Sequence, residues 1–259
     1  MIKFFRKIRI KLLVENRFNK YLLYAIGEIV LVVIGILIAL QINNWNEEKK
    51  ESITEKKILK ELLVDLEISK ADLENDINVN KKNLKKTEII KNHIYLKKKE
   101  NDSIEGLLVA ASVITQFTPR NSGYQNLQSV GLSIISNDAL RKEITNVFER
   151  NFEYSRLIGR DFDKIENSSI DLHPFFLKHF MMDVDNKYEY SFEDKFKHPT
   201  PSIKIKDYQA LLNDKDLIFM LQKTIYDRAN KLINYYRTNN KIDKVSNMIN
   251  EELKKMDDD

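Results

Sequence analysis

The chain has 259 residues, no cysteine, and a formal net charge of +4 from 43 basic and 39 acidic side chains. The lack of cysteine excludes disulfide bonds, thiol nucleophiles and thiolate metal sites. Glycine-rich phosphate loops and the G-x-S-x-G and H-E-x-x-H motifs are also missing from the sequence. We therefore expect a protein that is not an enzyme, has no catalytic or metal-binding residues and uses no cofactor.

The first segment, residues 1–20, is strongly basic. It carries seven Lys or Arg residues against Glu15, a local net charge of +6, whereas everything after Leu40 sums to −1. Phe4, Ile8 and Leu12 recur at four-residue spacing among the basic residues. This pattern is typical of an amphipathic helix lying on anionic lipid, but a loose basic tail explains it equally well.

Residues 21–42 form the predicted transmembrane helix. The run from Tyr21 to Leu40 is apolar apart from Glu28 and is long enough to cross a bilayer. Tyr24 and Trp45 stand near its two ends, where aromatic residues anchor membrane helices. The preceding positive charge places the N-terminus in the cytoplasm. A buried core helix and a cleaved signal peptide are alternatives, but a signal peptide has a shorter apolar run, so we predict an uncleaved signal-anchor.

One face of this helix carries Glu28, Gly35 and Ala39, and the last two form a small-residue packing pattern. We predict that this face packs against a second copy or a membrane partner, with Glu28 protonated or hydrogen-bonded there. Snorkelling of Glu28 to the interface and a proton-relay role are the alternatives.

A long helical stalk is predicted at about residues 45–99, because no Gly or Pro occurs between Gly35 and Gly106. It carries a heptad seam that faces other helices of the same chain or, alternatively, another copy. The lysine runs of this segment are interspersed with acids, so we predict no nucleic-acid binding. The seam consists of Leu59, Leu63, Leu66, Lys70, Leu73, Ile77, Asn80 and Leu84.

Residues 103–256 are predicted to form an antiparallel helical bundle, so the fold class is all-α, with residues 43–259 outside the cytoplasm. The expected helices are an apolar one at 104–117, one from Asn137 or Asp138 that Pro174 ends or kinks, and one at about 216–256. Residues 182–206 read as an exposed loop, in which 202–206 is the one short alternating piece.

The segment between residues 119 and 141 is the candidate recognition surface. It gathers Arg120, Tyr124 and Arg141 near Gln125 and Gln128, and binding residues favour connecting segments on a rigid scaffold. The alternative is a structural cap, whose apolar residues Leu127, Val130, Leu132 and Ile135 enter the core.

The best candidate for a metal site comprises Asp171, His173, His179, Asp183 and Asp185. The two histidines are six residues apart with a proline between them, which fits no standard ligand spacing. A polar helix end running into a loop is the favoured interpretation. An envelope metal-dependent hydrolase that uses residues 171–185 remains the alternative function.

The run YLLYAIGEIVLVVIGILIALQINNWNEE, at residues 21–48, resembles the signature of a family of bacterial single-span membrane proteins known only as a domain of unknown function. A weaker similarity continues through residues 124–131 and 135–141. The resemblance implies a bacterial inner-membrane protein with a periplasmic C-terminal domain, and it carries no known activity. We expect a membrane-anchored helical protein that binds or scaffolds a partner or ligand at the cell envelope.

Overall fold

The computed structural model describes residues 18–101, 103–160, 172–183, 188–191, 196–199 and 202–258. Most of these residues are helical, which confirms the predicted helical class. The amphipathic prediction for the start of the chain falls almost wholly outside the described residues. The chain divides into two compact units, Met1–Lys57 and Ile58–Asp259.

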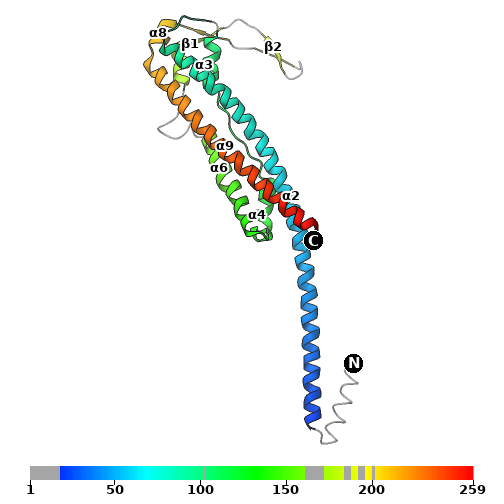
Figure 1. Cartoon of the computed structure of the whole chain (residues 1–259). Coiled ribbons are helices and arrows are strands. Elements are labelled where there is room, and N and C mark those ends of the chain that lie inside the picture. The colour runs from blue at the N-terminus through cyan, green and yellow to red at the C-terminus, as the bar shows by residue number, and fades with distance from the viewer. Residues whose placement is uncertain are drawn as a thin grey trace. The chain divides into compact units, whose positions relative to one another are not determined.

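Helices dominate both units (Figure 1). The longest are α2 (Phe18–Tyr95) and α9 (Lys215–Asp258). The shorter ones are α3 (Ile104–Ser112), α4 (Ser122–Val130), the 3-10 turn η1 (Leu132–Ile134), α5 (Asp138–Thr145), the π-helical η2 (Asn146–Asn151), α6 (Phe152–Arg160), α7 (His173–His179) and α8 (Tyr208–Asn213). The strands are β1 (Phe180–Asp183), β2 (Tyr188–Ser191), β3 (Phe196–Pro199) and β4 (Ser202–Ile205).

In the first unit, the large apolar side chains described on α2 are exposed. Among the described residues, α2 is the one helix long and apolar enough to cross a membrane, and its most apolar 18-residue window has a mean hydropathy of 2.6 with no part buried. Side chains such as Leu31 and Leu37 are more than half exposed. By length and composition, this helix is compatible with a membrane anchor.

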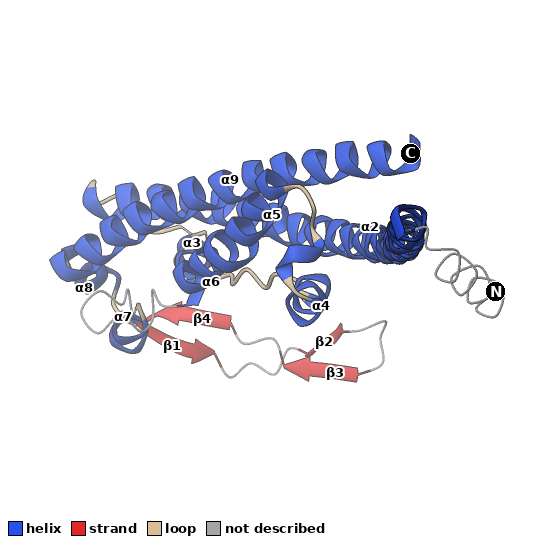
Figure 2. Cartoon of the chain, turned by 90° about the horizontal axis from the view of Figure 1, so that it is seen from below, coloured by secondary structure: helices blue, strands red, loops and turns tan. Residues whose placement is uncertain are grey.

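In the second unit, α2 and α9 lie side by side and run in opposite directions (Figures 1 and 2). Three cross-helix contacts show the reversed order: Lys70 with Asp243, Asn80 with Arg228, and Lys91 with Gln222. Buried positions alternate at four- and three-residue steps on both helices, which keeps one side of each turned toward the other. On α9 they are Leu217, Leu221, Thr224, Arg228, Lys231, Tyr235, Thr238, Ile242, Val245 and Ile249.

The seam on α2 agrees with the predicted one at five of its eight positions and differs at three. Leu63, Lys70 and Leu84 are only partly buried, whereas the neighbouring Leu62, Ser69 and Asn83 are buried. Hydrophobicity alone favours Leu84 over Asn83 and does not distinguish Leu63 from Leu62, whereas a buried polar side chain can gain partners inside the fold. Ser69, for example, accepts a hydrogen bond from the Arg120 backbone N–H at 2.9 Å.

Helix α3 ends five residues earlier than predicted, and residues 113–121 then follow α2 without helical structure. The Thr118 N–H donates to Asp72 Oδ2 at 2.9 Å, which fixes this segment to α2. The two glycines around α4 have different roles. Gly131 adopts a φ of +110°, which favours glycine at the end of α4, whereas Gly123 sits against the α2 backbone and donates its N–H to Asp65.

The prediction of an exposed loop at 182–206 is wrong for the described residues there, which form strands. β1 pairs with β4 and β2 pairs with β3, both antiparallel, and Phe180 lies opposite Ile205 (Figure 2). Each strand has four residues, too few for alternation to be recognised from the sequence. Pro174 also differs from its predicted role, because it lies in the first turn of α7, where its missing N–H costs nothing.

Two apolar clusters fill the core of the second unit. One joins α2 to α4, α5, η2, α6 and the C-terminal half of α9, with Leu66, Phe117 and Tyr235 fully buried. The other joins the end of α2 to α3, α7, β1, α8 and the start of α9, with Ile94 and Leu221 fully buried. The stretch between the clusters is polar, and it contains the candidate site described next.

Candidate functional site

A group of buried polar side chains, here termed the polar layer, separates the two apolar clusters. Its members come from α2, from the segment after α3 and from α9: Asp76, Asn80, Thr115, Arg228 and Lys231. Asp76, Asn80, Arg228 and Lys231 are buried because the 4–3 spacing of α2 and α9 turns them inward, whereas Thr115, in the segment after α3, is half-buried. Buried polar groups of this kind require hydrogen-bond partners.

Arg228 lies at the centre of the polar layer and is 7% exposed. Its guanidinium donates to the backbone carbonyls of Ala111 at 2.8 Å and Val113 at 2.7 Å, where α3 ends, and to Asn80 Oδ1 at 3.2 Å. Burial lowers the pKa of Arg228 to about 10, so it remains a cation at neutral pH. Arg228 therefore caps the C-terminus of α3, whose last carbonyls have no helical partner.

Lys231 and Asp76 form the other half of the layer. Lys231 donates to the Thr115 carbonyl and stands 5.3 Å from the centre of the Tyr235 ring. Burial raises the pKa of the Asp76 carboxyl, and the charge of Lys231 opposes that rise. Asp76 Oδ2 and the Tyr235 hydroxyl are buried without a hydrogen-bond partner among the described residues. Arg228 and Lys231 both donate hydrogen bonds to main-chain carbonyls at the end of α3 and in the segment after it. The polar layer therefore holds this segment between the long helices.

The sequence analysis missed Arg228, Lys231 and Asp76. A signal for the two cations was available, because Thr224, Arg228 and Lys231 continue the 4–3 spacing of the apolar residues on α9. Charged residues at seam positions are a known device for fixing the register of packed helices.

The three predicted recognition residues differ in how far their side chains are exposed. Tyr124 is 4% exposed, stacks on Phe148 with ring centres 4.7 Å apart, and donates its hydroxyl to Glu149 Oε1 at 2.7 Å. Burial, followed by this hydrogen bond, raises the pKa of Tyr124 to about 12. The side chains of Arg120 and Arg141 are 53% and 32% exposed. The structure thus places Tyr124 in the core, and recognition by this segment stays a prediction.

Both arginines also have local partners. The Arg120 Nε lies 3.4 Å from Asp65 Oδ1, and Arg141 donates to Asp138 Oδ1 and to the Ile135 carbonyl. Asn137 caps α5 by accepting from the N–H groups of Ala139 and Leu140. These contacts support the structural alternative for the segment.

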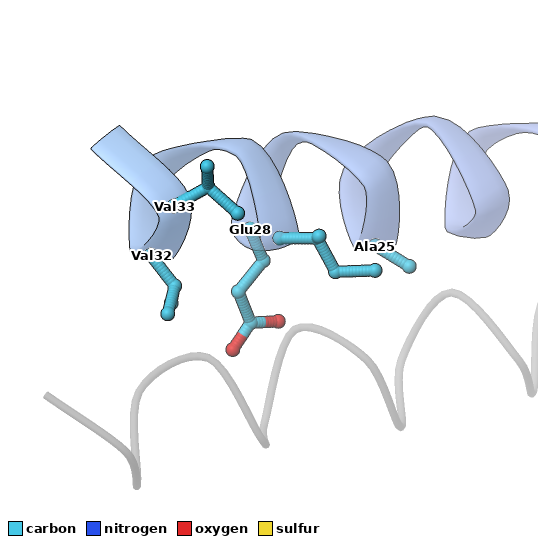
Figure 3. A pocket seen from close by; sticks show the side chains of 5 residues that line it. Ala25, Glu28, Val32 and Val33 are labelled. Carbon is cyan, nitrogen blue, oxygen red and sulfur yellow. The ribbon is translucent and has the colours of Figure 1, made fainter. Parts of the chain in front are cut away.

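The predicted packing face in the apolar run is open at Gly35 and Ala39, whereas Glu28 is half-buried. Figure 3 shows the Glu28 carboxylate directed away from the axis of α2, on the side that also carries Ala25 and Val32. A Cβ added at Gly35 would meet nothing within 4 Å, so the surface beside Gly35 and the exposed Ala39 is free for close approach of a helix. Packing by Glu28, Gly35 and Ala39 stays a prediction.

The candidate metal residues are only partly described. Asp171 and Asp185 lie outside the described residues, and no group of three or more His, Asp or Glu among the described residues could hold a metal ion. The buried His179 places its Nε2 2.6 Å from Asp214 Oδ2, and Lys178 donates to the same oxygen at 2.8 Å.

Asp214 has a structural role as the cap of α9. Its other oxygen accepts from the N–H groups of Asp216 and Leu217. Burial alone favours the neutral acid, but hydrogen bonds from Lys178 and His179 lower the pKa of Asp214 to about 2. The His179–Asp214 pair therefore anchors α7 to the start of α9.

Comparison with family models places residues 28–193 in a family of unknown function (DUF6090), and the chain belongs to that family. This confirms the resemblance seen in the sequence to a domain of unknown function. Comparison with curated proteins gives no match, and comparison with solved structures gives none.

Proposed function

We propose that the protein is a membrane-anchored, non-enzymatic scaffold, which holds a helical domain at the cell envelope and binds a partner there. The apolar run of α2 is the anchor, and the unit from Ile58 onward is an antiparallel helical bundle that carries the binding surface.

One observation carries the proposal: among the described side chains between Leu22 and Ile42, the large apolar ones are not covered by protein. Their exposed fractions lie between 47% and 71%. In water, such a surface carries a large free-energy cost, at about 25 cal/mol per Å² of apolar area. Lipid removes that cost, and a helix satisfies its own backbone groups within the bilayer.

The direction of insertion follows from charge. The +6 segment before the apolar run favours a cytoplasmic N-terminus. The anchor then crosses a bacterial inner membrane, and residues 43–259 lie in the periplasm. The buried polar groups of the bundle support a non-enzymatic role, since Arg228 and Asp214 are committed to backbone carbonyls and N–H groups.

The test is a pair of reporter fusions after Asp259. A reporter active only in the periplasm should be active, and a reporter active only in the cytoplasm should be silent; the opposite result overturns the orientation. Crosslinking in native membranes should then retrieve a specific partner. Metal analysis of the purified chain separates this proposal from a hydrolase at residues 171–185, because a stoichiometric metal would contradict the scaffold role.

A further inference from the structure

The outer face of α9 carries a straight line of exposed apolar side chains. Phe219, Tyr226 and Ile233 are 68%, 66% and 49% exposed and follow one another at seven-residue intervals. Seven residues are nearly two helical turns, so the three side chains lie within about 20° of one line along the helix. They point away from the seam that packs on α2, since Thr224, Arg228 and Lys231 are buried.

Cations stand at both ends of this line. Lys215 is one turn before Phe219, Arg237 is one turn after Ile233, and both are exposed. No ion pair with an acid is found for Lys215 or Arg237 among the described residues. The acids of α9 nearest to the line are Asp216, which follows the cation Lys215, and Asp227, which follows Tyr226. Each lies about 100° around the helix from the residue before it, and Asp227 is paired with Lys223 at 2.9 Å.

We propose that this outer face of α9 is the docking surface for an amphipathic helix with acidic residues at both ends of its apolar stripe. The proposal rests on the scaffold function above, for which it names the surface and the partner class. Lys215 and Arg237 are 22 residues apart, or about 33 Å along the axis, so the partner needs about three heptads. Its apolar stripe would pack between the side chains of the line, and its acids would pair with the two cations.

Two other occupants fit the face less well. A second copy of α9 would bring Lys215 close to Arg237 of the first in an antiparallel pair, and like charges would oppose contact. A lipid surface requires a broad apolar face, but Gln222 and Asn230 interrupt this narrow line. An apolar stripe at heptad spacing with Phe and Tyr is typical of helix-on-helix recognition.

The test uses the full chain in nanodiscs of uncharged lipid and two labelled synthetic helices of about three heptads. Both helices carry Leu at the stripe positions; one has Glu at both ends and the other has Lys. Fluorescence anisotropy should show binding of the Glu helix, weakened by salt, and little binding of the Lys helix. Equal binding of the two helices, or binding of neither, overturns the proposal.

Variants locate the site. Phe219→Ser with Tyr226→Ser should weaken binding of the Glu helix by about tenfold or more, since such residues dominate helix interfaces. Val64→Ser with Ile68→Ser, on the exposed face of α2, is the matched control and should leave binding unchanged. Lys215→Glu with Arg237→Glu should reverse the preference toward the Lys helix. All of these substitutions are at exposed positions, and thermal unfolding should confirm that the variants fold.

Two further results would identify a different occupant of this face of α9. A dimer in sedimentation that Tyr226→Ser abolishes would identify a second copy as the occupant, and binding only to anionic vesicles would identify lipid; either result overturns the acidic-helix proposal. The reporter fusions test the anchor and its orientation independently. Failure of peptide binding with the periplasmic reporter active would remove the docking surface and leave the membrane-anchored scaffold standing.

Discussion

Arg228 shows how carbonyl oxygens can stabilise a buried cation. Carbonyls at the end of α3 carry partial negative charge, because the last peptide groups of a helix lack donors. The guanidinium is a planar fork: Nη2 donates to the carbonyls of Ala111 and Val113, and Nη1 donates to Asn80 Oδ1. A lysine has one nitrogen and cannot reproduce this two-nitrogen geometry.

Arg228→Met should therefore destabilise the second unit by about 3 kcal/mol, because the carbonyls of Ala111 and Val113 and Asn80 Oδ1 lose buried donors. Thermal unfolding of the full chain in detergent, followed by circular dichroism, measures the change. Arg237→Met, on the exposed side of the same helix, should alter stability by less than about 0.5 kcal/mol. Equal effects of the two substitutions would contradict the role assigned to Arg228.

Asp214 should make the folded chain less stable as the pH falls. Its pKa is about 2 in the folded chain against a reference of 3.8, so its charge contributes stability above pH 4 that is lost as the pH falls toward 2. The contribution amounts to about 2 kcal/mol. Denaturant unfolding should show Asp214→Asn less stable than the natural chain at pH 7, with the gap closing near pH 2. The exposed Asp216→Asn is the control, and a gap of constant size from pH 7 to pH 2 would refute the coupling.

Among the elements, α4 depends on its close approach to α2. A Cβ at Gly123 would stand 2.9 Å from the carbonyl carbon of Glu61 and 3.0 Å from its oxygen, and backbone atoms cannot move aside locally. Gly123→Ala should cost about 2 kcal/mol in thermal unfolding. Gly106→Ala, within α3 and with nothing within 4 Å of its Cβ, should instead stabilise by up to about 1 kcal/mol. If both changes stabilise, α4 does not pack as described.

The elements also show what sequence could and could not predict. Composition and spacing sufficed for the long helices, because the lack of Gly and Pro and the repeated apolar positions extend over many turns. The exact seam on α2 was not predictable from hydrophobicity, because Ser69 is buried through a hydrogen bond to the backbone of Arg120, which is distant in the chain. The pairing of β1 with β4 depends on contacts across more than twenty residues, and its four-residue strands have no pattern of their own.

The apolar run of α2 makes a prediction at the same scale. Open space around Gly35 and the exposed Ala39 favour close packing of another helix. Gly35→Ile should weaken self-association or partner association in a membrane two-hybrid assay, because a branched side chain would keep the backbones apart. Gly27→Ile is the matched control, since Gly27 also has open surroundings but lies outside the Gly35–Ala39 pattern. Equal effects of both would place the packing face elsewhere.

For the whole molecule, the two units bury their apolar surface in different ways. The second unit buries many of its apolar residues in two clusters between its own elements. The first unit has apolar side chains along α2 without any protein cover among the described residues. Attachment to a membrane should therefore depend on that run and not on the helical domain.

Leu31→Lys with Ile34→Lys tests this dependence directly. Each lysine near the middle of a spanning helix costs about 2.5–3.5 kcal/mol in insertion, so the pair removes much of the gain from the apolar run. After carbonate extraction, the natural chain should stay in the membrane pellet, and the double variant should shift to the soluble or aggregated fraction. Val64→Lys with Ile68→Lys, at exposed positions of the second unit, should remain in the pellet. Retention of the first variant would mean that the chain is held by another segment or by a partner.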